Sequence, residues 1–257
     1  MSPRRFLETL SLLRLIEIMK FFIFIFLCLL DVSVWARTSL TMGVPFRIRR
    51  IPAILEYQNF VSEVLKDAGF DVVVKDTPAK MPYDLLVQGE VDAITYDDKT
   101  LTYERKKAVT VSFPLIRAHV RIFYRKDNTK FDPKSLKAFK GCISMNNVAI
   151  QNEASRQHLK FISTSNPLQS VQMVADGKAD YFLSVEEVGL SSISVIPETQ
   201  DKIAMADKIF MNLDIFVSFR SAFKNDLPRI EAAFRKHMAV DISKEYPILS
   251  KSINKNL

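Results

Sequence analysis

One short unit occurs twice in the sequence, and this repeat limits the folds open to the chain. Gln88–Thr95 and Asp176–Leu183 each end a helical pattern at a glycine, place an aspartate three residues later and continue as an apolar strand. Glycine ends helices because it accepts the left-handed turn that follows them. The repeat predicts two related α/β lobes with a cleft between them. Chance recurrence of a common helix–glycine–strand element is the alternative.

Residues 1–36 have the pattern of a secretory signal peptide. Lys20 precedes a ten-residue apolar run, Phe21–Leu30, and Val34-Trp35-Ala36 follows with a cleavage site after Ala36. The run is too short for a transmembrane helix. We therefore expect a periplasmic protein, with Met19 as an alternative start. A retained membrane anchor is the other interpretation.

The charge and cysteine content narrow the classes of partner. Removal of residues 1–36 takes away four basic and three acidic side chains, so the net charge falls from +7 to +6. No dense basic helix with interleaved aromatic residues occurs, which argues against nucleic acid. A moderately basic surface favours anionic small ligands. Only Cys142 remains after residue 36, so a disulfide within one molecule and a cysteine metal cluster are excluded, and the three histidines are widely spread. We expect neither a cofactor nor a metal, and we expect a monomer.

Long β-rich runs predict how the lobes are joined. Ala118–Arg125 and Asp207–Phe219 are long enough to begin in one lobe and end in the other, and we expect them to be the hinge strands. The predicted first lobe comprises residues 37–120 and 214–257, and the second lobe comprises residues 121–213. A short helix is expected over Asp132–Gly141 and another near the C-terminus.

Gly89–Asp127 resembles the bacterial extracellular solute-binding proteins of the amino-acid type, family 3. The matching features are the Gly-x-x-Asp-Ala strand at 89–93, the Thr-x-Thr-x-x-Arg turn at 100–105, Lys106-Lys107-Ala108 and Phe113-Pro114. The resemblance implies a type II periplasmic-binding-protein fold, α/β, with two lobes, each a mostly parallel sheet flanked by helices, and two hinge crossings. It covers most of residues 37–257 and is strongest at 89–126.

The resemblance also implies a ligand site. In the family, the first threonine and the arginine of the turn hold the ligand carboxylate, and the matching residues are Thr100 and Arg105. An arginine fork suits a carboxylate because two parallel charge-assisted bonds form at once. The alternative for Arg105 is a solvated helix residue. The other candidate ligand residues lie at strand ends and in the following loops: Thr102, Tyr96, Asp98, Arg47, Lys80, Asn146, Asn147 and Glu186.

Two departures from the family pattern concern the ligand. Val185 stands where the family has the aspartate that grips the ligand ammonium, and Met145-Asn146-Asn147 replaces a Gly-Ser/Thr turn. Carboxylate recognition is expected, whereas ammonium recognition is left open. The first hypothesis is a binding protein that delivers a small anionic solute to an ABC-type transporter or a sensor on a separate chain. The alternatives are a periplasmic dehydratase-like enzyme, with Glu186 or Asp98 as base, and an interaction domain with a vestigial cleft.

Overall fold

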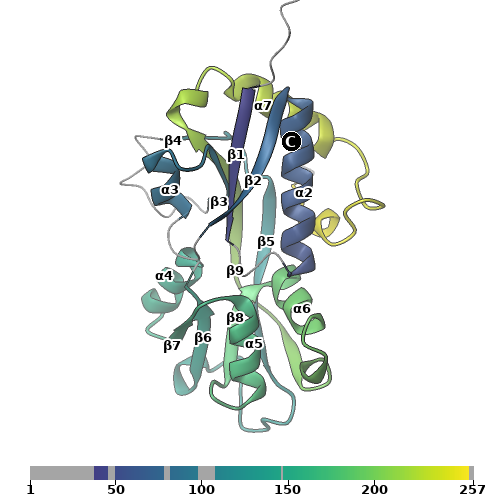
Figure 1. Cartoon of the computed structure of the whole chain (residues 1–257). Helices are drawn as coiled ribbons and strands as arrows, with labels where there is room; N and C mark the ends of the chain where they lie inside the picture. Colours follow the sequence, from purple (N-terminus) through teal and green to yellow (C-terminus); the bar gives the residue numbers. More distant parts are fainter. Residues whose placement is uncertain (1–37, 46–49, 78–81, 98–107, 146, 255–257) are drawn as a thin grey trace, which may run out of the picture. The chain divides into compact units, whose positions relative to one another are not determined.

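A computed structural model describes residues 38–45, 50–77, 82–97, 108–145 and 147–254 (Figure 1). Ser39–Leu257 form one compact unit. In the described part, no helix is long and apolar enough to cross a membrane. The strands are β1 (Thr38–Pro45), β2 (Phe70–Thr77), β3 (Ala93–Asp97), β4 (Ala108–Thr110), β5 (Ile116–Arg125), β6 (Lys140–Ser144), β7 (Lys160–Thr164), β8 (Tyr181–Val185) and β9 (Ile203–Arg220). The helices are α2 (Pro52–Asp67), α3 (Pro82–Gln88), α4 (Val148–Arg156), α5 (Pro167–Ala175), α6 (Glu186–Ser194) and α7 (Leu227–Met238), with 3-10 turns η3 (Leu136–Ala138), η4 (Pro197–Thr199), η5 (Ser221–Phe223) and η6 (Leu249–Lys251).

The described strands form one mixed sheet in the order β2-β1-β3-β9-β5-β8-β6-β7, and β4 pairs with β9. β1 pairs with β3 in parallel, and β6 pairs in parallel with both β7 and β8. The two long strands β5 and β9 pair with each other between these parallel groups. β9 continues beyond β5 to pair with β3, while β5 pairs with β8 on its other side. The two-lobe α/β fold with two hinge crossings is therefore confirmed; the predicted lobe boundaries stay a prediction.

The repeated glycine–aspartate unit has the same structural role in both halves. Gly89 and Gly177 have φ values of 79° and 70°, in the left-handed region that favours glycine. The Asp92 carboxylate accepts the Thr41 backbone N–H of β1 at 2.8 Å. The Asp180 carboxylate accepts the Lys140 backbone N–H of β6 at 2.9 Å. Each aspartate thus fastens the start of its strand to the neighbouring parallel strand.

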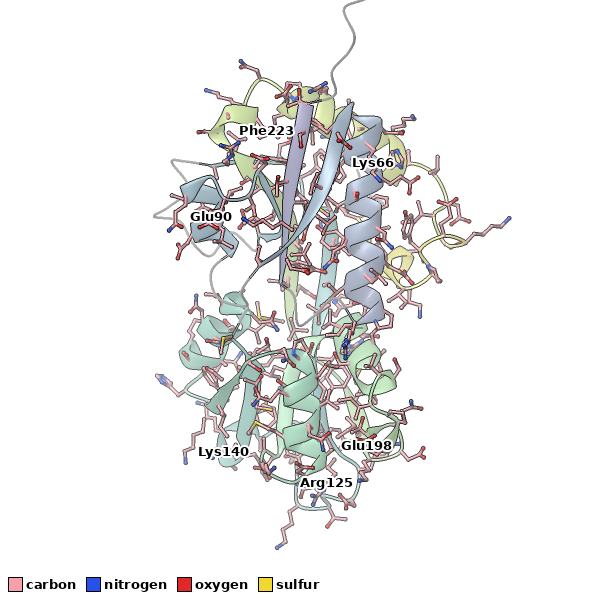
Figure 2. The ribbon with its side chains drawn as sticks, viewed as in Figure 1. Lys66, Glu90, Arg125, Lys140, Glu198 and Phe223 are labelled. Atoms are coloured by element: carbon pink, nitrogen blue, oxygen red, sulfur yellow. The ribbon has the colours of Figure 1, made fainter. Side chains whose placement is uncertain are left out.

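Separate apolar clusters fill the two halves of the sheet. The largest cluster packs buried residues of β1, α2 and α7 together, with Leu40, Phe60 and Phe234 fully or almost fully buried. Two further clusters pack α4, α5 and α6 on β6 and β8, and the Phe123 and Phe182 rings stack there at 4.7 Å. Charged side chains such as Lys66, Glu90 and Glu198 are exposed (Figure 2). Because these apolar clusters are separate, each half of the sheet has a core of its own.

The helix expected over Asp132–Gly141 is wrong except for the 3-10 turn η3. The Asp132 carboxylate accepts the Lys134 backbone N–H and the Ser135 hydroxyl, both at 2.9 Å. These local bonds hold the backbone in a turn, because a short polar side chain competes with the helix for backbone donors. The expected C-terminal helix is also reduced to a 3-10 turn, η6.

Candidate functional site

A cavity of about 110 Å³ lies where the two halves of the sheet meet. Gly43 of β1, Thr95 and Tyr96 of β3, Ser144 of β6 and Ser184 of β8 line it near the carboxyl ends of their strands. Ligands of open α/β sheets bind outside these strand ends. One water molecule needs roughly 10–15 Å³ of such cavity volume, so the cavity has room for several waters or a small solute.

Most side chains around the cavity are apolar, and a few polar groups lie among them. This composition is typical of small-molecule sites, in which apolar contacts supply area and a few polar groups fix orientation. The apolar and aromatic lining consists of Ala53, Ile54, Tyr57, Ile94, Tyr96, Ile116, Pro167, Val185, Val188, Leu213, Ile215, Ile248 and Leu249. The polar lining side chains are those of Thr95, Ser144, Asn147, Ser184, Glu187 and Ser252.

Five of the lining side chains have a buried polar atom with no hydrogen-bond partner among the described residues. A buried hydroxyl without a partner costs about 1–3 kcal/mol, so folded proteins rarely keep several in one place. Their convergence on one cavity is what a ligand or bound water would relieve. The atoms are Tyr57 OH, Thr95 Oγ1, Ser144 Oγ, Ser184 Oγ and Glu187 Oε2.

Two tyrosines form the aromatic part of the wall. Tyr57 of α2 and Tyr96 of β3 pack edge to face, with ring centroids 5.0 Å apart. Burial raises the pKa of Tyr57 well above its usual value, and the neighbouring Tyr96 and Asp97 add to this rise. Burial likewise raises the pKa of Tyr96. Both hydroxyls therefore stay protonated at physiological pH and are available as hydrogen-bond donors.

Glu187 is the acidic side chain of the described cavity wall. It follows Glu186 at the start of α6, and its Oε2 atom is buried. Burial raises the pKa of the Glu187 carboxyl, and the charge of Glu186 adds to the rise. A hydrogen bond with its own backbone and the charges of His119 and Lys251 act in the opposite direction and are outweighed. The Glu187 carboxyl therefore stays neutral to a higher pH than the carboxyl of an exposed glutamate.

Three of the predicted ligand residues fall in the described part of the chain. Tyr96 and Asn147 line the cavity. Glu186 does not line it, because its carboxylate accepts Arg121 Nε at 2.7 Å. The remaining predicted residues lie outside the described residues, so their roles stay predictions: Arg47, Lys80, Asp98, Thr100, Thr102, Arg105 and Asn146.

Glu187 was not among the predicted ligand residues, although its neighbour Glu186 was. α6 begins at Glu186, and Glu187 in its first turn lines the cavity. Tyr57, Ser144 and Ser184 were missed as well. The two serines stand at or next to the carboxyl ends of β6 and β8, which is a signal that the sequence carried.

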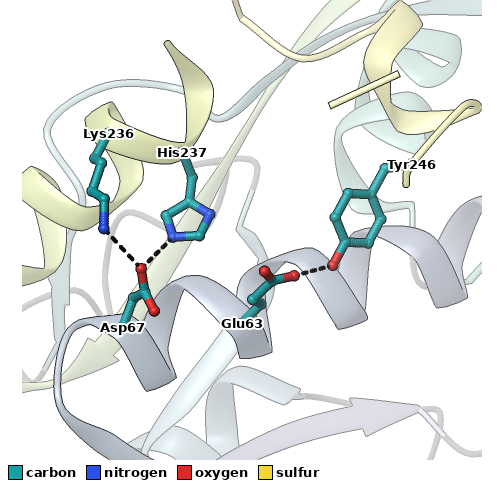
Figure 3. Close-up of polar contacts among 5 residues, drawn as sticks. All are labelled: Glu63, Asp67, Lys236, His237 and Tyr246. Carbon is teal, nitrogen blue, oxygen red and sulfur yellow. Dashed lines mark hydrogen bonds and ion pairs between the residues drawn. The ribbon is translucent and has the colours of Figure 1, made fainter. Parts of the chain in front are cut away.

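The C-terminal segment contributes one side of the cavity through Ile248, Leu249 and Ser252. One carboxylate oxygen of Glu56 on α2 accepts the backbone N–H groups of Ile248 and Leu249, at 2.8 and 3.0 Å. Figure 3 shows two further attachments of the same helix. Glu63 accepts the Tyr246 hydroxyl, and Asp67 pairs with Lys236 and His237 at 3.1 and 2.9 Å. α2 thus positions the segment that lines the site.

Comparison with solved structures identifies the fold. A histidine kinase sensor domain with similarity to periplasmic binding proteins superposes with a TM-score of 0.66 at 14% identity, over 84% of this chain and 95% of that one. This is the periplasmic-binding-protein fold. An ancestral arginine-binding protein bound to arginine gives 0.63 at 16% identity, over 84% and 96% of the two chains. An ancestral amino-acid-binding protein, AncCDT-1, described as a precursor of cyclohexadienyl dehydratase, gives 0.60 at 15% identity, over 83% and 92%.

Comparison of the sequence itself finds no match. No family model and no curated protein matches this chain. Because the structural neighbours are so distant in sequence, they show the fold of the chain and leave its membership of family 3 a prediction. The cavity between the halves has to carry any functional conclusion.

Proposed function

We propose that this chain is a periplasmic solute-binding protein that captures a small carboxylate-bearing solute in the cavity between its lobes. One observation carries the proposal: five buried polar atoms without partners among the described residues converge on a cavity with an otherwise mostly apolar wall. Partner-less hydroxyls are a cost in the ligand-free protein and a gain when a solute supplies the missing bonds. A vestigial cleft would be expected to have lost this polar lining.

The carboxylate is assigned to the solute on the basis of Arg105 and Thr100, which match the turn that holds the ligand carboxylate in the family that the sequence resembles. Hydroxyl groups on the described wall suit the same chemistry, because each can donate to a carboxylate oxygen. The signal-peptide pattern of residues 1–36 supports a periplasmic location. Delivery of the solute to an ABC-type transporter or a membrane sensor on a separate chain completes the proposal. The hinge strands β5 and β9 are where closure on the solute would occur.

A thermal-shift screen of amino acids, dicarboxylates and small monocarboxylic acids tests the proposal. A compound that binds the folded protein raises Tm by an amount that grows with its concentration. Arg105→Gln should weaken binding of the active acid by about 10- to 100-fold, because it removes charge-assisted bonds worth about 1.5–3 kcal/mol. Lys106→Gln is the matched control: it removes the same charge one residue away and should leave affinity within about twofold. Equal effects of the two variants would refute the role of Arg105.

A dehydratase-like enzyme is the second candidate, and Glu187 is the observation in its favour. A partly buried carboxyl with a raised pKa on the wall of a solute cavity is suited to act as a general acid or base. Glu186, which the sequence analysis named as a candidate base, accepts a hydrogen bond from Arg121 and does not line the cavity. Incubation of each stabilising compound with the protein, followed by NMR of the solution, separates the two functions. A binding protein leaves the compound intact, whereas an enzyme converts it over many turnovers.

A further inference from the structure

Glu187, whose Oε2 atom is buried, shares its cavity with the proposed site for an anion. Resting on the proposed function, we infer that the solute anion binds together with a proton, which Glu187 holds. In the proposed function the single positive charge of Arg105 pairs with the solute carboxylate, so an ionised Glu187 in the same cavity would be left without a counter-ion, and it takes up a proton. The described cavity wall offers Glu187 hydroxyls and apolar groups, and no cation of that wall forms an ion pair with it.

The charged groups around Glu187 leave it without a direct counter-ion in the described part of the chain. Glu186 is adjacent and forms an ion pair with Arg121, so the Arg121 charge is already paired with another carboxylate. His119 of β5 and Lys251 of η6 act on Glu187 from a distance, and neither hydrogen-bonds to it. His119 is itself bonded to Asn212 at 2.8 Å. α5, which packs on α6, carries no titratable side chain within Pro167–Ala175.

On the described cavity wall, the other titratable side chains are Tyr57 and Tyr96, which stay protonated. The start of α6 favours a negative charge on Glu187 through the helix dipole, but this effect is weaker than the desolvation of a buried carboxyl. A protonated Glu187 changes from an acceptor that repels the solute carboxylate into a donor that binds it. The same step turns the one described acid of the cavity wall into part of an anion site.

The probe for this inference is isocaproate, a monocarboxylate with an apolar body that suits the apolar lining. Leucine is its matched zwitterion, because the two differ only by the α-ammonium group. At pH values above the pKa of Glu187 in the ligand-free protein, calorimetric titration of isocaproate should show uptake of about one proton and an affinity that falls about tenfold for each pH unit. Glu187→Gln keeps a donor at the same place, so it should bind isocaproate at the low-pH affinity of the natural protein without pH dependence. Glu186→Gln is the control and should retain the slope.

A measurement without ligand checks the state of Glu187 independently. A carboxyl whose pKa is raised in the folded state stabilises the fold fully below its unfolded pKa of about 4.3, and this stability is lost as the pH rises through the folded pKa. The Tm of Glu187→Gln should therefore exceed that of the natural protein by an amount that grows from acid to neutral pH. A constant difference would overturn the inference.

Other outcomes separate this inference from the proposed function. Isocaproate binding that is flat with pH, or a slope that persists in Glu187→Gln, overturns the inference and leaves a carboxylate-binding protein. Preference for leucine, lost in Glu187→Gln, also overturns it, because an ionised Glu187 would then pair with the ammonium group. Failure of every acid at every pH removes the proposed function, and the inference with it.

Discussion

Removal of the Tyr57 hydroxyl should stabilise the ligand-free protein and weaken the binding of its solute. The hydroxyl is buried, has no partner among the described residues and lines the cavity, while the ring packs on Tyr96. A buried hydroxyl without a partner costs about 1–3 kcal/mol, and water in the cavity recovers part of this. Tyr57→Phe should therefore raise the free energy of unfolding by about 0.5–1 kcal/mol, which is about 1–4 °C in Tm for a domain of this size.

The same substitution removes one hydrogen bond to the solute. A net bond worth about 0.5–1.5 kcal/mol corresponds to a loss of affinity of about 2- to 13-fold. Urea unfolding of the ligand-free protein and calorimetry with the best acid from the screen measure the two effects. Opposite signs are the signature of a group that is kept for binding at the expense of stability.

Tyr181→Phe is the matched control for Tyr57→Phe. Tyr181 is also fully buried, and its hydroxyl also lacks a partner among the described residues, but it does not line the cavity. This variant should gain stability in the same range while its affinity for the solute stays unchanged. If Tyr57→Phe destabilises the protein and leaves affinity unchanged, the argument from unpartnered cavity atoms is refuted.

Three further substitutions test how the fold supports the cavity. Glu56→Ala should lower the free energy of unfolding by about 1–2 kcal/mol in urea titrations, because two backbone N–H groups of the C-terminal segment lose their shared acceptor; no change would show that the segment is held in another way. Gly189→Ala should cost about 1–3 kcal/mol by the same assay, since its Cβ would lie 2.4 Å from the Phe123 ring, and an unchanged midpoint would contradict this packing. Asp92→Ala should cost about 2–3 kcal/mol, because Arg220 and the Thr41 N–H lose their partner, and a loss below about 0.5 kcal/mol would contradict that role.

The fold was predictable because its signals are local and strong. Gly89 and Gly177 end helices in the left-handed conformation that the sequence predicted, and the long β-rich runs became β5 and β9. The repeated aspartates were visible as a pattern, but their role was not. Asp92 and Asp180 each bind a backbone N–H on a strand roughly forty to fifty residues away along the chain, and such pairings follow from topology.

The described part of the site was harder to predict, for two physical reasons. Its hydroxyl groups sit on ordinary serine, threonine and tyrosine residues, which carry no motif until strand ends and α2 bring them together. The two adjacent glutamates also differ in a way that the sequence does not show, since Glu186 bonds to Arg121 while Glu187 lines the cavity. Tyr96 and Asn147 stand next to predicted strand and helix boundaries and line the cavity, and their contact with a ligand stays a prediction.

A crystal structure with the acid that gives the largest thermal shift tests the central claim most directly. The account predicts the acid inside the cavity, with polar atoms within about 3.2 Å of Tyr57 OH, Ser144 Oγ or Ser184 Oγ and its carboxylate on Arg105. An acid bound elsewhere on the protein would contradict the account. So would a cavity filled by the protein's own side chains, with those three hydroxyls already bonded.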